Sequence, residues 1–206
     1  EKKFVIVTGD KYPDENAGAV RIQSFAKIIT ELGFSSCVIG MGRSTSFQWS
    51  EYDGISYCSL RYDRKNRVSR ILGRALFGHN LKKVLNRSEL SEIGGILYVS
   101  GGIFALRYVK RLSRRYAIPL YFDSVEWYSP SEFKMRKMSP AYVANNRLNT
   151  HSVDRKFRVF AISAFLEEHF RSRGIPTIRI PVIMDVQKMP FRETNDESTE
   201  SEKIRM

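Results

Sequence analysis

Short apolar runs alternate with longer amphipathic stretches along most of the chain. The first run, 4–7, is rich in β-branched residues, and a polar loop separates it from 17–32, where apolar residues recur at helical spacing. Residues 67–85 have the same spacing with an interruption near Gly78, which predicts one broken helix or two short ones. Further strands are predicted at 37–39, 55–60, 95–99, 119–122, 159–162 and 178–180, and further helices at 103–116, 141–154 and 164–173.

This order of strands and helices predicts an α/β domain. A parallel connection must cross the sheet, and it does so most compactly as a helix, so we expect a doubly wound, mainly parallel, Rossmann-like sheet with helices on both faces. The domain is predicted to span residues 1–186. Residues 187–202 lack an apolar period and are acidic, which predicts a linker, and 203–206 have the character of the first residues of a truncated second domain.

Composition narrows the class of protein. The 206 residues suit one domain, and 42% hydrophobic residues are typical of a globular chain. A net charge of +12 predicts a surface that attracts phosphates, nucleic acid or anionic lipid. Nucleic-acid binding has no motif to support it, so no nucleic-acid partner is expected. Cys37 and Cys58 lie in apolar runs and are expected to be reduced, buried thiols of a cytoplasmic protein, peripheral at most on the inner face of the plasma membrane.

The loop between the first strand and the first helix stands where open α/β sheets bind ligands. It lacks the G-x-G-x-x-G fingerprint, which disfavours a nicotinamide cofactor. Gly18 lies at the predicted helix start, where free backbone amides attract a diphosphate, and Arg21 follows one turn later. Alternatively, Asn16 caps the helix and Gly18 only relieves crowding.

A second loop at the same predicted edge combines carboxylates with aromatic rings. Asp123 and Glu126 can accept hydrogen bonds from sugar hydroxyls, and Trp127 and Tyr128 offer faces for sugar C–H groups, so this mixture suits a carbohydrate. The alternative is that the rings pack on the core and that Glu126 pairs with a nearby cation. A third turn, 100–104, contains a glycine pair that either belongs to the same site or only allows close packing.

The segment 61–87 is strongly basic. On a helix, such residues predict a patch for an anionic membrane surface or for phosphate, although a solvated basic helix is the alternative. The patch residues are Arg67, Arg70, Arg74, Lys82 and Lys83. The three histidines show neither ligand nor triad spacing, so no metal site and no hydrolase are predicted.

Two segments together resemble retaining GT-B glycosyltransferases of family four. YPDENAGAVRIQSFAKIITELGF is similar to the early loop and helix of that family, and VFAISAFLEEHFRSRGIPTIRIPVIMDV is similar to the end of its N-terminal domain. FDSVEWYSPSEF resembles the middle loop of bacterial members, in which a histidine is common. Asp123-Ser124-Val125-Glu126 stands in its place here.

The resemblance implies the N-terminal half of a two-domain enzyme that faces a second domain across a cleft. It implies no cofactor, a UDP- or GDP-sugar co-substrate, and a glycan or lipid-linked acceptor. Gly18 and Arg21 would then meet the donor diphosphate, Tyr12, Trp127 and Tyr128 the acceptor, and Asp123 and Glu126 are the candidate catalytic residues. The nucleotide and a glutamate pair would belong to the absent C-terminal domain, so the isolated chain is expected to be inactive. The alternative function is a stand-alone basic module that binds a phosphorylated ligand.

Overall fold

The structure is a computed structural model, and it describes residues 2–13, 16–42, 47–61, 67–85 and 90–183. One eight-stranded sheet has the order β3-β4-β2-β1-β5-β6-β7-β8, and every strand pair is parallel except β3 with β4. The strands are β1 (Lys3–Lys11), β2 (Ser35–Gly42), β3 (Trp49–Tyr52), β4 (Ile55–Arg61), β5 (Ile93–Tyr98), β6 (Leu120–Ser124), β7 (Phe157–Ala161) and β8 (Thr177–Arg179).

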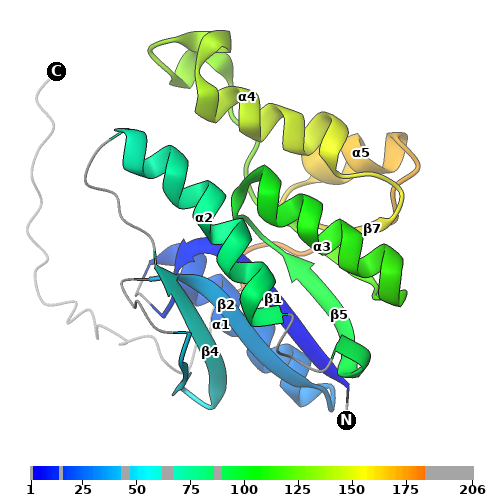
Figure 1. The fold of residues 1–206 in the computed structure, drawn as a ribbon. Coiled ribbons are helices and arrows are strands. Elements are labelled where there is room, and N and C mark those ends of the chain that lie inside the picture. The colour runs from blue at the N-terminus through cyan, green and yellow to red at the C-terminus, as the bar shows by residue number, and fades with distance from the viewer. Residues whose placement is uncertain (1, 14–15, 43–46, 62–66, 86–89, 184–206) are drawn as a thin grey trace, which may run out of the picture.

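Helices cover both faces of this sheet. In Figure 1, α2 and α3 lie in front of the strands and α1 lies behind them. The helices are α1 (Ala17–Glu31), α2 (Arg67–Leu85), α3 (Gly102–Tyr116), α4 (Pro140–Arg147) and α5 (Ala164–Ser172). The predicted doubly wound α/β sheet is therefore confirmed.

Alternate residues of the strands enter two separate cores because successive side chains point to opposite faces. Val5 and Val7 of β1 pack in the larger core with residues of α2, α3 and α5. Ile6 packs in the smaller core with residues of α1, including Ile22 and Phe25. Strands buried on both faces have continuous apolar runs, and this is why the strands were visible in the sequence.

Helix α2 is continuous, so the predicted break near Gly78 is wrong. A side chain at Gly78 would place its Cβ 2.8 Å from the Cβ of Phe104 and 2.9 Å from the backbone N of Ala105. The glycine therefore lets α3 approach α2 closely, and its neighbours keep the helical conformation. Similarly, the predicted helix 141–154 is α4 followed by a π-helical turn, Leu148–Ser152.

The short strand β3 was missed by the sequence analysis. Its four residues are all exposed, so they carry no buried period, and it forms an antiparallel hairpin with β4 through Asp53 and Gly54. The predicted linker 187–202 and the segment 203–206 lie outside the described residues. Within the described ranges, no helix is long and apolar enough to cross a membrane.

Candidate functional site

The strand order reverses between β1 and β5, from which the chain winds outward in both directions. In open α/β sheets, ligands bind outside the carboxyl ends of the strands at such a switch point. Three polar side chains meet here. The Oγ of Ser100 accepts a hydrogen bond from the backbone N–H of Gly9 (2.7 Å), and the hydroxyls of Thr8 and Ser100 lie 3.0 Å and 3.3 Å from Oδ2 of Asp10.

At this switch point the backbone at Gly9 and the backbone at Gly101 lie very close together. A Cβ on Gly9 would lie 2.9 Å from the backbone N of Gly101, and Gly101 has a φ of 138°, which a side chain rarely permits. A Cβ on Gly101 would also lie 2.7 Å from the ring of Phe77 in α2. The glycine pair of the 100–104 turn therefore has a packing role, and it brings the Ser100 hydroxyl to the end of β1.

The amino-terminal end of α1 borders the same network. Asn16 caps the helix, because its Oδ1 accepts a hydrogen bond from the backbone N–H of Ala19 (3.0 Å). A Cβ on Gly18 would lie 3.6 Å from Oδ2 of Asp10. A carboxylate therefore already faces this helix end and opposes the approach of a diphosphate. The predicted diphosphate contact at Gly18 stays a prediction, and a bound diphosphate here would need a cation from outside α1.

Arg21 and Asp123 form a buried bidentate ion pair between α1 and β6. Nε of Arg21 donates to Oδ2 of Asp123, and Nη2 donates to Oδ1, both at 2.8 Å. Arg21 is 8% exposed and Asp123 is 2% exposed. Two parallel charge-assisted hydrogen bonds fix both groups in one geometry.

The same guanidinium also holds the segment that follows β8. Nη1 of Arg21 donates to the carbonyl of Pro181 (2.8 Å), and Nη2 donates to that of Ile180 (3.2 Å). The guanidinium lies over the ring of Phe25, 5.0 Å from its centroid. With four of its hydrogen bonds made inside the fold, Arg21 joins three distant parts of the chain. Its predicted contact with a donor diphosphate is untested, and this geometry gives the side chain a structural role.

Burial raises the pKa of Asp123, whereas the hydrogen bonds and the positive charge of Arg21 act in the opposite direction. The carboxylate makes both of its close contacts with Arg21, and it is almost inaccessible to solvent. In this arrangement Asp123 positions Arg21. The catalytic role predicted for Asp123 stays a prediction.

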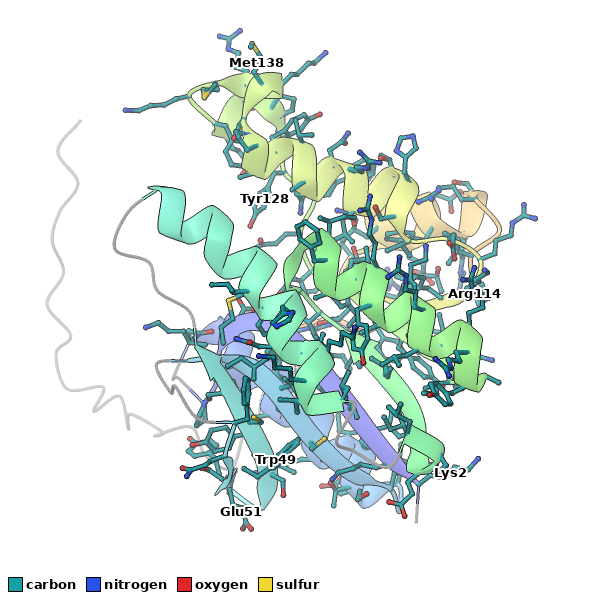
Figure 2. All side chains as sticks on the ribbon, in the orientation of Figure 1. Lys2, Trp49, Glu51, Arg114, Tyr128 and Met138 are labelled. Atoms are coloured by element: carbon teal, nitrogen blue, oxygen red, sulfur yellow. The ribbon has the colours of Figure 1, made fainter. Side chains whose placement is uncertain are left out.

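Glu126 differs from Asp123 because it is exposed. Its Oε2 accepts a hydrogen bond from the hydroxyl of Tyr128, which is itself only partly buried. Figure 2 shows Tyr128 at the base of the segment that carries α4. A carboxylate and a phenol in this position can both exchange hydrogen bonds with the hydroxyls of a ligand. Glu126 is therefore open to a ligand, and Tyr128 is partly so.

Three asparagines hold the loop of Glu126 in place. The amide of Asn149, which is 1% exposed, donates to the carbonyl of Glu126 (3.3 Å), and its Oδ1 accepts from Oγ of Ser124 (3.2 Å). Asn145 also donates to the carbonyl of Glu126 (3.2 Å) and accepts from the backbone N–H of Tyr128 (3.1 Å). The third, Asn146, accepts from Nε1 of Trp127 (3.1 Å).

Two predicted acceptor contacts are used in packing. The ring of Trp127 lies 4.3 Å from that of His169 and 5.7 Å from that of Phe165, so it packs against α5. Tyr12 is 3% exposed in the smaller core, where its ring packs against Tyr57 and its hydroxyl donates to Gln23. Their parts in acceptor binding stay predictions. For Trp127 the described contacts support the packing alternative, and Tyr12 packs within the smaller core.

The basic patch can be located only in part. Lys82 and Lys83 are exposed on α2, and the ammonium of Lys83 lies 6.0 Å from the centroid of the Phe47 ring. The side chains of Arg67, Arg70 and Arg74 lie outside the described part of the structure. Helices α2 and α3 are direct neighbours, as their approach at Gly78 requires.

Four polar residues of the site were not predicted from the sequence: Thr8, Asp10 and Ser100 at the switch point, and the buried Asn149. Asp10 and Ser100 each follow a predicted strand, which is a usable signal. Asn149 gave no signal, because a polar residue in a polar helix looks solvated.

The described residues contain no group of three His, Cys, Asp or Glu side chains suited to a metal ion. Cys37 and Cys58 are buried free thiols, and burial raises the pKa of Cys37 to about 11.

No protein-family model matches the chain, and no curated protein matches it significantly. Several solved structures, in contrast, match the chain. An E. coli trehalose-6-phosphate structure bound with UDP-2-fluoro glucose superposes with a TM-score of 0.52 at 11% identity, over 88% of this chain and 49% of its own. The UDP-GlcNAc 2-epimerase of Methanocaldococcus jannaschii gives 0.53 at 9% identity, over 86% and 45%. An α,α-trehalose-phosphate synthase (UDP-forming) from Burkholderia vietnamiensis gives 0.50 at 10% identity, over 88% and 47%.

The chain has the fold of one Rossmann-like half of a GT-B protein. It spans slightly less than half the length of each of these three proteins. The predicted GT-B half-domain fold is thereby confirmed. In this half-domain, the switch point at β1 and β5 and the loop after β6 lie at the same edge of the sheet, because carboxyl ends of parallel strands meet there.

Proposed function

We propose that this chain is the acceptor-side half of a GT-B glycosyltransferase. The enzyme would move a sugar from a UDP- or GDP-sugar to a glycan or lipid-linked acceptor. The observation that carries the proposal is the match of nearly the whole chain to one half of proteins whose names include UDP-sugars or UDP-forming synthesis. Polar side chains at the carboxyl edge of the sheet support it.

In this function, Glu126 and Tyr128 orient an acceptor hydroxyl. The bond that forms joins the acceptor oxygen to the anomeric carbon of the sugar, and the bond that breaks joins this carbon to the diphosphate oxygen. The diphosphate leaves with the electron pair of the broken bond and takes up the proton that the acceptor hydroxyl loses. Glu126 is the exposed carboxylate of the loop and is therefore the better candidate to receive a hydrogen bond from that hydroxyl.

The diphosphate is expected to be held mainly by a second domain. Within the described residues, Arg21 is engaged by Asp123, and Asp10 lies beside Gly18. Charge that develops on the leaving diphosphate needs cationic groups or helix amino-terminal ends aimed at it. This division of labour also explains why we expect the isolated 206-residue chain to be inactive.

A stand-alone module for a phosphorylated ligand is the second candidate, and the net charge of +12 favours it. The coding sequence after Met206 separates the two. A further strand and helix array with a glutamate pair supports the enzyme, whereas a stop codon directly after Met206 in the native gene contradicts it.

The biochemical test uses the full polypeptide encoded by the gene. It is incubated with UDP- and GDP-sugars and with a panel of glycan and lipid-linked acceptors, and the release of UDP or GDP is measured. We expect acceptor-dependent release from the full polypeptide and none from the 206-residue chain alone. Sugar transfer by the isolated chain would contradict the half-enzyme, and no release with any donor would contradict the transferase.

A further inference from the structure

Residues 129–147, which we call the α4 lobe, project from one end of the sheet (Figure 1). The lobe begins with a capping box, in which Ser129 and Glu132 exchange hydrogen bonds, and continues through two 3-10 turns, Pro130–Glu132 and Arg136–Met138, into α4. It packs on the rest of the chain mainly at its base. Its outer turn, around Met138, is the part farthest from the base in Figure 2.

Two large apolar side chains are exposed at this turn. Met138 is 78% exposed and Met135 is 50% exposed. The backbone N–H of Met138 donates to the carbonyl of Met135 (2.9 Å), which closes a 3-10 turn. Met135 and Met138 therefore flank a single short turn. Exposure of these two methionine side chains to water costs hydrophobic free energy, which burial against a partner would recover.

The methionines alternate with cations. The outer turn reads Lys134-Met135-Arg136-Lys137-Met138, and all five side chains are exposed. The whole lobe has four basic residues, the fourth being Arg147, against the single acid Glu132. The tip is therefore apolar and positively charged at the same time.

The base of the lobe is fixed. Asn145 bonds the backbone at Glu126 and Tyr128, and the rings of Tyr128, Phe133 and Tyr142 pack in a row at 5.6 Å and 6.3 Å. The tip is thus held in an outward position by contacts that do not involve the methionines. A preformed surface loses little conformational entropy on binding.

We propose that the α4 lobe docks on an anionic lipid bilayer, with Met135 and Met138 in the headgroup layer and with Lys134 and Lys137 on lipid phosphates. Amphipathic surface elements bind bilayers through buried apolar area together with attraction between cations and anionic lipid. The tip protrudes and its apolar side chains are separated by cations, and this pattern fits a layer of headgroups better than the groove of an acidic protein. The docking surface is distinct from the basic patch predicted on α2.

The first experiment measures binding of the protein to vesicles of mixed phosphatidylglycerol and phosphatidylcholine by cosedimentation. Each cation near an anionic surface contributes about fivefold in affinity, so Lys134→Glu with Lys137→Glu is expected to weaken binding by at least about 25-fold. Met135→Ser with Met138→Ser is expected to weaken it by about tenfold. Neither measurement needs a sugar, so failure here leaves the proposed transferase untouched.

Matched controls separate the lobe from net charge. Arg107→Glu with Arg114→Glu makes the same change in charge on exposed positions of α3, and Leu32→Ser removes a 69% exposed apolar side chain elsewhere. Both controls are expected to change binding by less than about threefold, with unchanged thermal unfolding in all variants. An equal loss in the α3 control would overturn the assignment, as would binding that is lost only with Arg70→Glu and Arg74→Glu on α2.

A probe at the tip tests insertion directly. Cys37 and Cys58 are buried, and burial raises the pKa of both thiols, so a thiol-reactive, polarity-sensitive fluorophore should label Met138→Cys selectively in the folded protein. We expect a blue shift on anionic vesicles and quenching by a lipid-borne quencher. The same fluorophore on Leu32→Cys should show neither. The proposal is overturned if the Met138→Cys spectrum does not shift while vesicles are bound. It is also overturned if the wild-type protein does not bind anionic vesicles and binds only an acidic protein.

Discussion

Two carboxylates near the end of β6 have opposite surroundings. Asp123 is 2% exposed and makes two 2.8 Å hydrogen bonds with Arg21, whereas Glu126, only three positions later, is exposed and pairs with the hydroxyl of Tyr128. Asp123 belongs to β6, and Glu126 lies in the asparagine-held loop that follows this strand. The difference teaches that burial, and not residue type, separates a carboxylate that is used up inside the fold from one that stays open to solvent.

Substitutions in the two regions are expected to affect different properties of the protein. A substitution of Asp123 should lower the stability of the fold. A substitution of Asn149 should loosen the loop that joins Asp123 to Glu126. A substitution of Glu126 should lower activity alone.

Asp123→Ala is expected to have the largest effect. It leaves the Arg21 guanidinium buried without its carboxylate, and loss of one partner of a buried pair lowers the free energy of unfolding by about 3–5 kcal/mol. Urea unfolding followed by circular dichroism measures this change. The control is the double variant Arg21→Met with Asp123→Leu, which removes both charges and should recover most of the loss. A loss below about 1 kcal/mol in the single variant would mean that water reaches the pair.

Asn149→Ala should have an intermediate effect. The substitution leaves the carbonyl of Glu126 with one donor fewer and Ser124 without its acceptor, and such buried polar groups cost about 1–3 kcal/mol. Urea unfolding gives the stability, and hydrogen exchange at residues 124–128 should show weaker protection than in the wild type. Thr150→Ala, in the same π-helical turn, is the control and should leave the protection of this loop unchanged. Equal protection in Asn149→Ala and wild type would contradict the role of Asn149.

Glu126→Gln should leave stability almost unaltered. Exposed positions seldom change the free energy of unfolding by more than about 0.5 kcal/mol. If Glu126 receives a hydrogen bond from the acceptor hydroxyl, kcat/KM of the full polypeptide should fall by about 10- to 100-fold, the range for a charged hydrogen bond. The exposed Glu168→Gln on α5 is the control. A full rate with Glu126→Gln would remove this residue from the proposed site.

Most of the fold was predictable from the sequence, because strands buried on both faces and amphipathic helices have distinct periods. The antiparallel β3 was missed since its exposed residues have no such period. The break assigned to α2 came from treating Gly78 as a local signal. Its reason is tertiary: it faces Phe104 on a neighbouring helix.

The candidate site was predictable only as a set of residue types. Arg21 and Asp123 were both singled out, but each was assigned to a ligand, because nothing in a sequence shows that two residues 102 positions apart are partners. Likewise, Trp127 and Tyr12 were expected to face an acceptor, and the contacts described for them are with His169 in α5 and within the smaller core. Residue type indicates what a side chain can bind, and the register of distant strands decides what it does bind.

The contacts of Arg21 also have a consequence for synthesis of the chain. Its guanidinium belongs to α1, yet its last acceptor, the carbonyl of Pro181, lies 160 positions later. At about 5–20 residues per second, roughly 10–30 s separate the appearance of the two groups from the ribosome. During this time water hydrates the guanidinium of Arg21 in place of these carbonyls. We therefore expect α1 to reach its final packing only after residues 180–181 have left the ribosome. Although α1 precedes the other described helices in the chain, it would then be among the last of them to reach its final packing.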